Sequence, residues 1–182
     1  GLKIQNDKDT DIFSEAVPFI PVVAGGAWYV CCPAGNNFID FEKAFLQRCF
    51  QSSTIIWVKN SLVLGHGDYH YKHEPILYGW EKGSVHKYYG GRDQTTVWEI
   101  ERPSRSSEHP IMKPVLLSER AINNSSRIDN IVLDPFGGSG STLIACKKLS
   151  RRCYMMEIDQ HYCDVIIKRW EDFTGKIKEK IE

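Results

Sequence analysis

The chain has 182 residues, of which 42% are hydrophobic and 25% are charged. This composition is ordinary for a globular protein with a buried core, and it excludes a wholly disordered, collagen-like or low-complexity chain. Lysine plus arginine and aspartate plus glutamate both number 23, so the formal net charge is zero. A neutral total gives no sign of a nucleic-acid partner and excludes none, because a local basic groove can coexist with it.

The sequence shows neither a membrane helix nor a secretory signal. Its apolar runs are too short to cross a bilayer, and its first residues are polar. The six cysteines form no CxxC pair. We therefore predict free thiols, a cytoplasmic location and no membrane partner. The cysteines are Cys31, Cys32, Cys49, Cys146, Cys153 and Cys163.

The first part of the chain predicts two short strands, one helix and a long irregular region. Residues 27–32 and 54–58 are apolar and rich in strand formers, and residues 38–50 carry apolar side chains near helical spacing. Residues 59–108 differ, because they are rich in Gly, His, Tyr and charged residues and contain only short apolar runs. This region predicts hairpins and loops that form a surface rather than a core.

The last third alternates regularly between predicted strands and helices. Residues 130–134 and 153–157 are apolar strands that each end in an acid. Helices are expected over residues 112–124, 141–149 and 160–173. This alternation is typical of a parallel α/β sheet, whose ligands bind at the carboxyl ends of the strands.

The sharpest local pattern is Asp-Pro-Phe-Gly-Gly-Ser-Gly-Ser-Thr at residues 134–142. Glycines let a turn approach a ligand closely, and the helix that follows offers N–H groups. A P-loop is excluded because no lysine follows the last glycine, and a dinucleotide fingerprint is incomplete because Leu143 stands at its third glycine. S-adenosylmethionine is the third option.

Two acids favour S-adenosylmethionine as the ligand of this turn. Asp134, before the glycines, suits the methionine ammonium, and Glu157, at the end of the next strand, suits the ribose hydroxyls. The alternative is that both acids cap helices and that the glycines only form a tight loop. Upstream, residues 109–114 (His-Pro-Ile-Met-Lys-Pro) predict a rigid entry into a helix that can pack beside the same pocket.

Taken in order, these motifs resemble the beta class of DNA amino-methyltransferases, especially its prophage and restriction-modification members. In that class the catalytic motif comes first, a target-recognition region follows, and the cofactor motifs come last. The matching segments run over almost the whole chain. They are residues 56–60 (Ile-Trp-Val-Lys-Asn), 68–75 (Asp-Tyr-His-Tyr-Lys-His-Glu-Pro), 109–114, 134–140, 156–159 (Met-Glu-Ile-Asp) and 162–170.

The resemblance implies a single α/β domain over residues 1–182 with a three-layer, Rossmann-like, circularly permuted methyltransferase fold. It divides this domain into a catalytic half, an irregular target-recognition insertion, a cofactor-binding half and a tail. Their bounds are residues 1–58, 59–108, 109–175 and 176–182.

The resemblance also implies S-adenosyl-L-methionine as the cofactor. The glycine-rich turn would cradle its methionine part, Glu157 would hold its ribose, and the segment before the helix would line the pocket. The implied cofactor-binding residues are His109, Lys113, Asp134, Pro135, Phe136, Gly137, Gly138, Ser139, Gly140, Ser141, Thr142 and Glu157.

By the same resemblance, the parent enzyme methylates an exocyclic amine in double-stranded DNA, and adenine N6 is favoured over cytosine N4. The insertion would contact phosphates or base edges through basic side chains. These are Lys59, Lys72, Arg92, Arg102 and Arg105. Tyr69, Tyr71 and Trp80 are candidates for stacking on bases, although an aromatic side chain is more often packed within the protein.

The chain departs from the family pattern at three places. Ile111 stands where Thr is usual, and Ser150 stands where Gly is usual. The catalytic tetrapeptide, Asp-Pro-Pro-Tyr or a variant, is absent because no two prolines are adjacent. Since that motif holds the amine and stacks on the flipped base, no catalytic residue is assigned. We expect a fragment, a truncated form or one part of a split enzyme, completed by an upstream segment or a complementary chain.

The sequence leaves three alternative functions. A nicotinamide-dependent oxidoreductase needs the third glycine and leaves residues 56–75 unexplained. A zinc site lacks the helix that such a site requires, so no metal is predicted; its candidate ligands would be His66, His70, His73 and Glu74. The third alternative is an inactive remnant that binds only cofactor or DNA.

Overall fold

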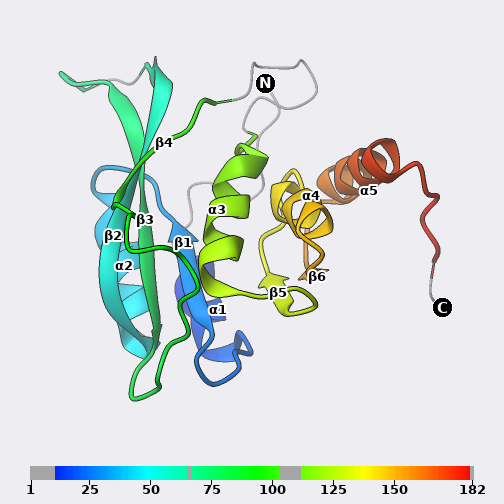
Figure 1. The fold of residues 1–182 in the computed structure, drawn as a ribbon. Coiled ribbons are helices and arrows are strands. Elements are labelled where there is room, and N and C mark those ends of the chain that lie inside the picture. Colours follow the sequence, from blue (N-terminus) through cyan, green and yellow to red (C-terminus); the bar gives the residue numbers. More distant parts are fainter. Residues whose placement is uncertain (1–10, 65–66, 103–111, 181–182) are drawn as a thin grey trace. The chain divides into compact units, whose positions relative to one another are not determined.

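The computed structural model describes residues 11–64, 67–102 and 112–180 (Figure 1). The chain divides into two compact units, Gly1–Glu101 and Arg102–Glu182, and each is described by itself. The expectation of a single domain remains a prediction. None of the helices in the described ranges combines the length and apolar character that a bilayer crossing requires.

The first unit is built on a four-stranded sheet in the order β1-β3-β2-β4. Strand β3 pairs antiparallel with both β1 and β2, whereas β4 pairs parallel with β2. Strands β1, β2 and β4 therefore run in the same direction, and their carboxyl ends lie at one edge of the sheet (Figure 1). The strands are β1 (Ala27–Cys31), β2 (Cys49–Val63), β3 (Tyr71–Glu81) and β4 (Val97–Glu99).

The long β2–β3 hairpin agrees with the hairpins expected in residues 59–108, but it corrects the expectation that this region forms a surface rather than a core. Strand β3 buries a continuous run, in which Ile76 is 2% exposed and Leu77 is 0% exposed. The apolar pattern of this run is short in the sequence, because polar residues precede it and Gly79 follows its apolar side chains. Gly79 is required by packing, since a Cβ there would overlap the carbonyl oxygen of Phe50 on the neighbouring strand.

Helix α2 (Asn37–Arg48) confirms the helix that apolar spacing predicted, and it covers the core of the first unit. Phe45 is fully buried in a cluster with Trp28 and Leu77. A second cluster joins Ala44 to the N-terminal helix. That N-terminal part, helix α1 (Asp11–Ala16) followed by the 3₁₀ helix η1 (Val17–Phe19), was not anticipated from the sequence.

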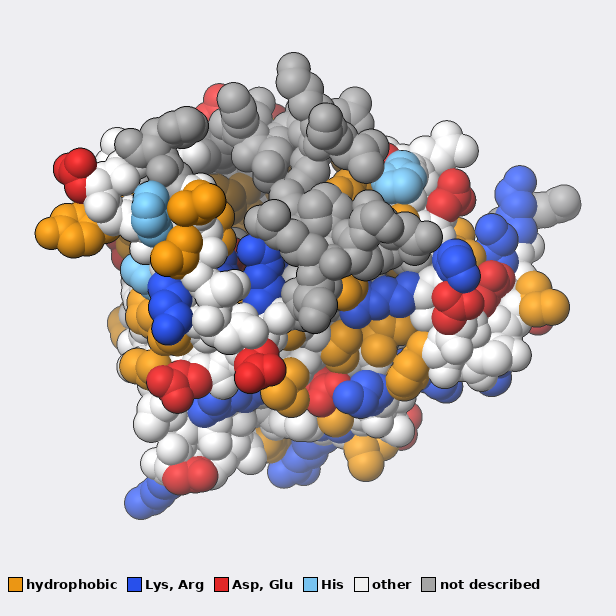
Figure 2. All heavy atoms as spheres, turned by 90° about the horizontal axis from the view of Figure 1, so that it is seen from above, with side chains coloured by type: hydrophobic (Ala, Val, Ile, Leu, Met, Phe, Trp, Pro, Cys, Tyr) orange, Lys and Arg blue, Asp and Glu red, His pale blue; other side chains and the backbone are white. Residues whose placement is uncertain are grey.

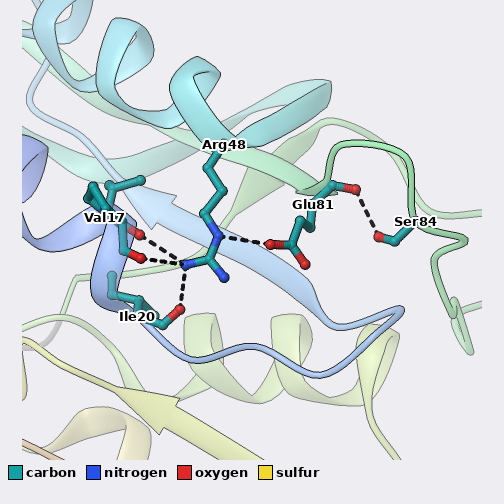
Figure 3. A network of polar contacts seen from close by, with 6 residues as sticks. Val17, Ile20, Arg48, Glu81 and Ser84 are labelled. Carbon is teal, nitrogen blue, oxygen red and sulfur yellow. Dashed lines mark hydrogen bonds and ion pairs between the residues drawn. The ribbon is translucent and has the colours of Figure 1, made fainter.

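Arg48, the last residue of α2, ties three segments of the first unit together (Figure 3). Its Nε donates to Oε1 of Glu81 at 3.0 Å, and its Nη1 donates to the carbonyl oxygens of Val17 at 3.1 Å and Ile20 at 2.6 Å. The guanidinium also lies 5.5 Å from the ring centroid of Trp28. These charge-assisted bonds hold the segment after η1, which pairs with no strand in the described structure.

The second unit confirms the predicted succession of strand, turn, helix, strand and helix. Strands β5 (Ile131–Asp134) and β6 (Arg152–Met155) are parallel. Helices α3 (Val115–Ser125) and α4 (Ser141–Lys148) share a buried cluster formed by Ile122, Ala145 and Cys146. Helix α3 starts later than expected, with Pro114 as its N-cap. Helix α5 (Gln160–Thr174) ends at Gly175.

The end of α4 explains why glycine is the usual residue at position 150. The N–H of Arg151 donates to the carbonyl of Cys146 at 2.8 Å, and the N–H of Ser150 points to the carbonyl of Lys147 at 3.4 Å. This is a Schellman ending, which needs a left-handed residue and usually takes glycine. Ser150 adopts φ = 57°, so a side chain stands where a glycine is preferred.

We predict that Ser150→Gly stabilises the chain by about 1 kcal/mol, because glycine relieves the left-handed strain at the end of α4. Urea denaturation measures the change. Ser118→Gly, within α3, is the matched control and is expected to destabilise by about 0.5 kcal/mol, since glycine weakens a helix interior. A loss of stability in Ser150→Gly would contradict the strain argument.

Candidate functional site

The glycine-rich turn is bound by backbone hydrogen bonds to the end of strand β6. The N–H of Gly137 donates to the carbonyl of Met156 at 2.8 Å, and the N–H of Met156 donates to the carbonyl of Asp134 at 3.0 Å. Within the turn, the N–H of Gly140 donates to the carbonyl of Gly137 at 2.9 Å. The turn therefore has a fixed shape at the carboxyl ends of two parallel strands, where ligands of α/β sheets bind.

Glu157 joins the turn from the end of β6. Its Oε2 accepts the N–H of Gly138 at 2.7 Å, and its Oε1 accepts the N–H of Asp159 at 2.9 Å. Each carboxylate oxygen has two acceptor positions, so both oxygens keep one for a ligand. The predicted ribose-binding acid thus lies directly against the predicted methionine-binding turn.

Asp134 shapes the same turn. Its Oδ1 accepts the N–H of Phe136 at 3.1 Å. Like Glu157, Asp134 accepts a backbone N–H group, as expected if the two acids have only a structural role. The acceptor positions left over on both carboxylates are available to a ligand as well. The Phe136 side chain is 48% exposed.

Two glycines of the turn are required by their surroundings. A Cβ on Gly137 would lie 2.7 Å from the side chain of Met155 and 3.1 Å from the carbonyl of Met156. Gly140 has φ = 78° and serves as the N-cap of α4, with a Cβ position 3.1 Å from Ile166 on α5. Close packing of the turn between β6 and α5 therefore explains the glycine spacing.

Arg169, which no sequence pattern singled out, supports the turn from α5. Its Nη1 donates to the carbonyl oxygen of Ser139 at 2.8 Å and lies 3.2 Å from Oγ of Ser141. Burial lowers the pKa of this half-buried guanidinium. Arg169 falls within the matching segment of residues 162–170, but nothing in its spacing links it to a serine 30 residues away.

The segment before α3 reaches the turn through Lys113. Oγ of Ser141 donates to the carbonyl oxygen of Lys113 at 2.6 Å. The Lys113 side chain is exposed. The structure thus brings Lys113 beside the turn, while His109 lies outside the described residues.

The predicted DNA contacts fall into different environments. Lys72 and Arg92 are exposed, Arg102 is half-buried, and Arg105 lies outside the described residues. Lys59 is only 5% exposed, and its ammonium binds Oε1 of Glu74 at 2.6 Å. This ion pair counts against a phosphate contact by Lys59, because breaking it would leave the Glu74 carboxylate without its cation.

The aromatic candidates also differ in access. Tyr69 is 90% exposed and Tyr71 is 46% exposed. Figure 2 shows histidine and hydrophobic side chains together over this hairpin end of the first unit. Trp80, in contrast, already stacks on His86 with ring centroids 3.7 Å apart, so one of its faces is covered.

Among the described residues, the histidines near the hairpin belong to no cluster that could hold a metal ion. His66 lies outside the described residues, and elsewhere no group of three or more His, Cys, Asp or Glu side chains is placed to hold an ion. His73 instead lines an open cavity of about 240 Å³ with Tyr71 and Phe38.

Comparison with known proteins identifies the family. Residues 23–169 match the family model of N6/N4 DNA methylases. The chain belongs to this DNA methylase family. The type II methyltransferase M2.MboI of Moraxella bovis is 27% identical over 157 residues, which cover 80% of this chain and 53% of M2.MboI. The chain thus spans about half the length of this curated relative.

Solved structures of DNA methyltransferases share the fold. The M1.HpyAVI–SAM complex is 26% identical with a TM-score of 0.73, and the match covers 91% of this chain and 83% of that one. The cytosine-N4-specific PvuII DNA methyltransferase is 15% identical with a TM-score of 0.73, covering 96% of this chain and 79% of that one. These likenesses confirm the predicted α/β, Rossmann-like methyltransferase fold.

We predict that Glu157→Ala destabilises the second unit by about 2 kcal/mol, because two backbone N–H groups lose a charged acceptor. Hydrogen exchange at the Gly138 amide should accelerate. Asp159→Ala is the control: it removes the cap on the His161 N–H, at 2.8 Å, and costs about 1 kcal/mol, while the Gly138 amide stays protected. Unchanged exchange at Gly138 in Glu157→Ala would show that the carboxylate does not hold the turn.

Proposed function

We propose that the chain supplies the cofactor-binding and DNA-recognising parts of a DNA amino-methyltransferase of the restriction-modification type. The methyl donor is S-adenosyl-L-methionine, and the acceptor is an exocyclic amine in double-stranded DNA, adenine N6 in preference to cytosine N4. The observation that carries the proposal is the bond from Gly138 to Glu157, which sets a carboxylate against the glycine-rich turn. Family membership and the SAM complex of M1.HpyAVI support it.

The residues of the turn fit this cofactor in chemical type. The carboxylate of Glu157 suits a ribose diol, since one carboxylate can accept two hydroxyl donors. Asp134 suits the methionine ammonium. The first N–H groups of α4 suit the methionine carboxylate, because a helix leaves them without partners in its own backbone. The cofactor would supply an electrophilic methyl on its sulfonium, and the protein would bind and orient it.

The proposed DNA contacts lie in the first unit. Lys72 and Arg92 offer exposed charge for phosphates, and Tyr69 offers an exposed ring. Lys59 is left out of this set because of its ion pair with Glu74. The cytoplasmic location expected from the sequence is kept as part of this proposal.

Methyl transfer further requires the catalytic tetrapeptide, which the chain lacks. We place this motif on another segment of polypeptide, either linked to the chain or in a complementary chain. The alternative is a remnant that binds cofactor or DNA without catalysis. An enzyme completed by the motif should methylate DNA, whereas a remnant should not. Cofactor binding does not depend on the motif in this proposal, so it tests the cofactor site itself.

Calorimetric titration should show saturable binding of S-adenosylmethionine and none of NAD. Asp134→Ala and Glu157→Ala should each weaken the affinity by about tenfold or more, the range expected when a charged hydrogen-bond partner is lost. Lys168→Ala, on the exposed side of α5, is the control and should bind normally. Binding of NAD instead, or undiminished affinity in both acid variants, would refute the proposed cofactor site.

DNA affinity should fall steeply with salt, because bound phosphates release counterions when Lys72 and Arg92 contact them. Each of Lys72→Gln and Arg92→Gln should reduce the slope of log affinity against log salt by about 1. Lys43→Gln, an exposed charge on α2 outside the proposed contact set, is the control. A flat salt profile, or slopes unchanged by both variants, would reject these residues as phosphate contacts.

A further inference from the structure

Arg169 brings a positive charge to the glycine-rich turn, and none of the acids in the described ranges forms an ion pair with it. It takes part in none of the four ion pairs found among the described residues. Its recorded partners are uncharged oxygens: the Ser139 carbonyl at 2.8 Å, Ser139 Oγ at 3.4 Å and Ser141 Oγ at 3.2 Å. A half-buried cation with neutral partners retains a strong attraction for an anion.

The hydrogen bonds of the two serines have a direction. Arg169 can only donate, so both serine oxygens accept from it. Ser141 sends its own proton to the Lys113 carbonyl at 2.6 Å. For the Ser139 hydroxyl, no acceptor is recorded in the described part of the chain. The hydroxyl hydrogen of Ser139 therefore points away from the guanidinium and can be donated to another group.

The backbone adds donors at the same place. Helix α4 starts at Ser141, and its first N–H groups have no acceptor within the helix. The helix dipole adds partial positive charge there. Guanidinium, hydroxyl and helix start thus favour an anion near Ser139 and the start of α4, whereas the carboxylates of Asp134 and Glu157 favour cationic or hydroxyl groups near the parts of the turn that they bind.

This inference rests on the proposed function, because it assigns one group of the proposed cofactor. S-adenosylmethionine carries a carboxylate on its methionyl part. We propose that Arg169 is the positioning residue of a carboxylate subsite, in which it orients the hydroxyl of Ser139 toward the carboxylate and supplies the compensating charge. The subsite is formed by Arg169, Ser139 and the start of α4.

The test compares S-adenosylmethionine with its decarboxylated analogue, which keeps the sulfonium, the amine and the adenosine but lacks the carboxylate. Calorimetry on Arg169→Met and on Ser139→Ala should show affinity for S-adenosylmethionine reduced about tenfold or more. The affinity for the decarboxylated analogue should stay unchanged. Arg169→Lys, which keeps the charge without the planar fork, should recover part of the loss.

Lys168→Met is the matched control, since Lys168 neighbours Arg169 on α5 but is 70% exposed and pairs with Asp172. It should bind both compounds as the parent chain does. Equal losses for the two compounds in both test variants would make Arg169 and Ser139 supports of the fold and overturn the subsite, as would no loss at all. Failure of the unaltered chain to bind either compound would refute the proposed function and this inference with it.

Discussion

The carboxylate of Glu157 is the contact on which the organisation of the second unit depends. It accepts N–H groups from Gly138 in the turn and from Asp159 at the start of α5, so one side chain fixes both the turn and the last helix at the end of β6. Backbone bonds between Met156 and residues 134 and 137 complete the same junction. The geometry needs glycine at 137 because β6 passes too close for a side chain.

Charge is divided across this junction. Asp134 and Glu157 face the turn from the ends of the strands, and Arg169 reaches it from α5. A ligand that carries both an ammonium and a carboxylate matches such a division, which a phosphate does not, since acids on one side would repel it. The proposed choice of S-adenosylmethionine over a dinucleotide therefore has an electrostatic basis beyond the missing third glycine.

The parts that could be predicted from the sequence are those fixed by local pattern. Strands β5 and β6, the turn, and helices α4 and α5 follow from apolar periodicity and glycine spacing within short windows. The ion pair between Lys59 and Glu74 could not be predicted, because it is set by the register of the β2–β3 hairpin, which no local pattern reveals. Arg48 and Arg169 were missed for the same reason, since their partners lie about 30 residues away.

The acids at the junction serve folding and, in the proposed function, binding through the same atoms. Their backbone bonds already fix the positions of the carboxylates. A ligand would therefore bind a site that folding has ordered in advance. Substitution of Glu157 must therefore disturb the turn and the ligand contact together. Arg169 and Ser139 take no part in the Glu157 bonds, so charge and hydroxyl direction can be altered there while those bonds stay in place. Ligand recognition can be separated from folding at these two residues, but not at Glu157.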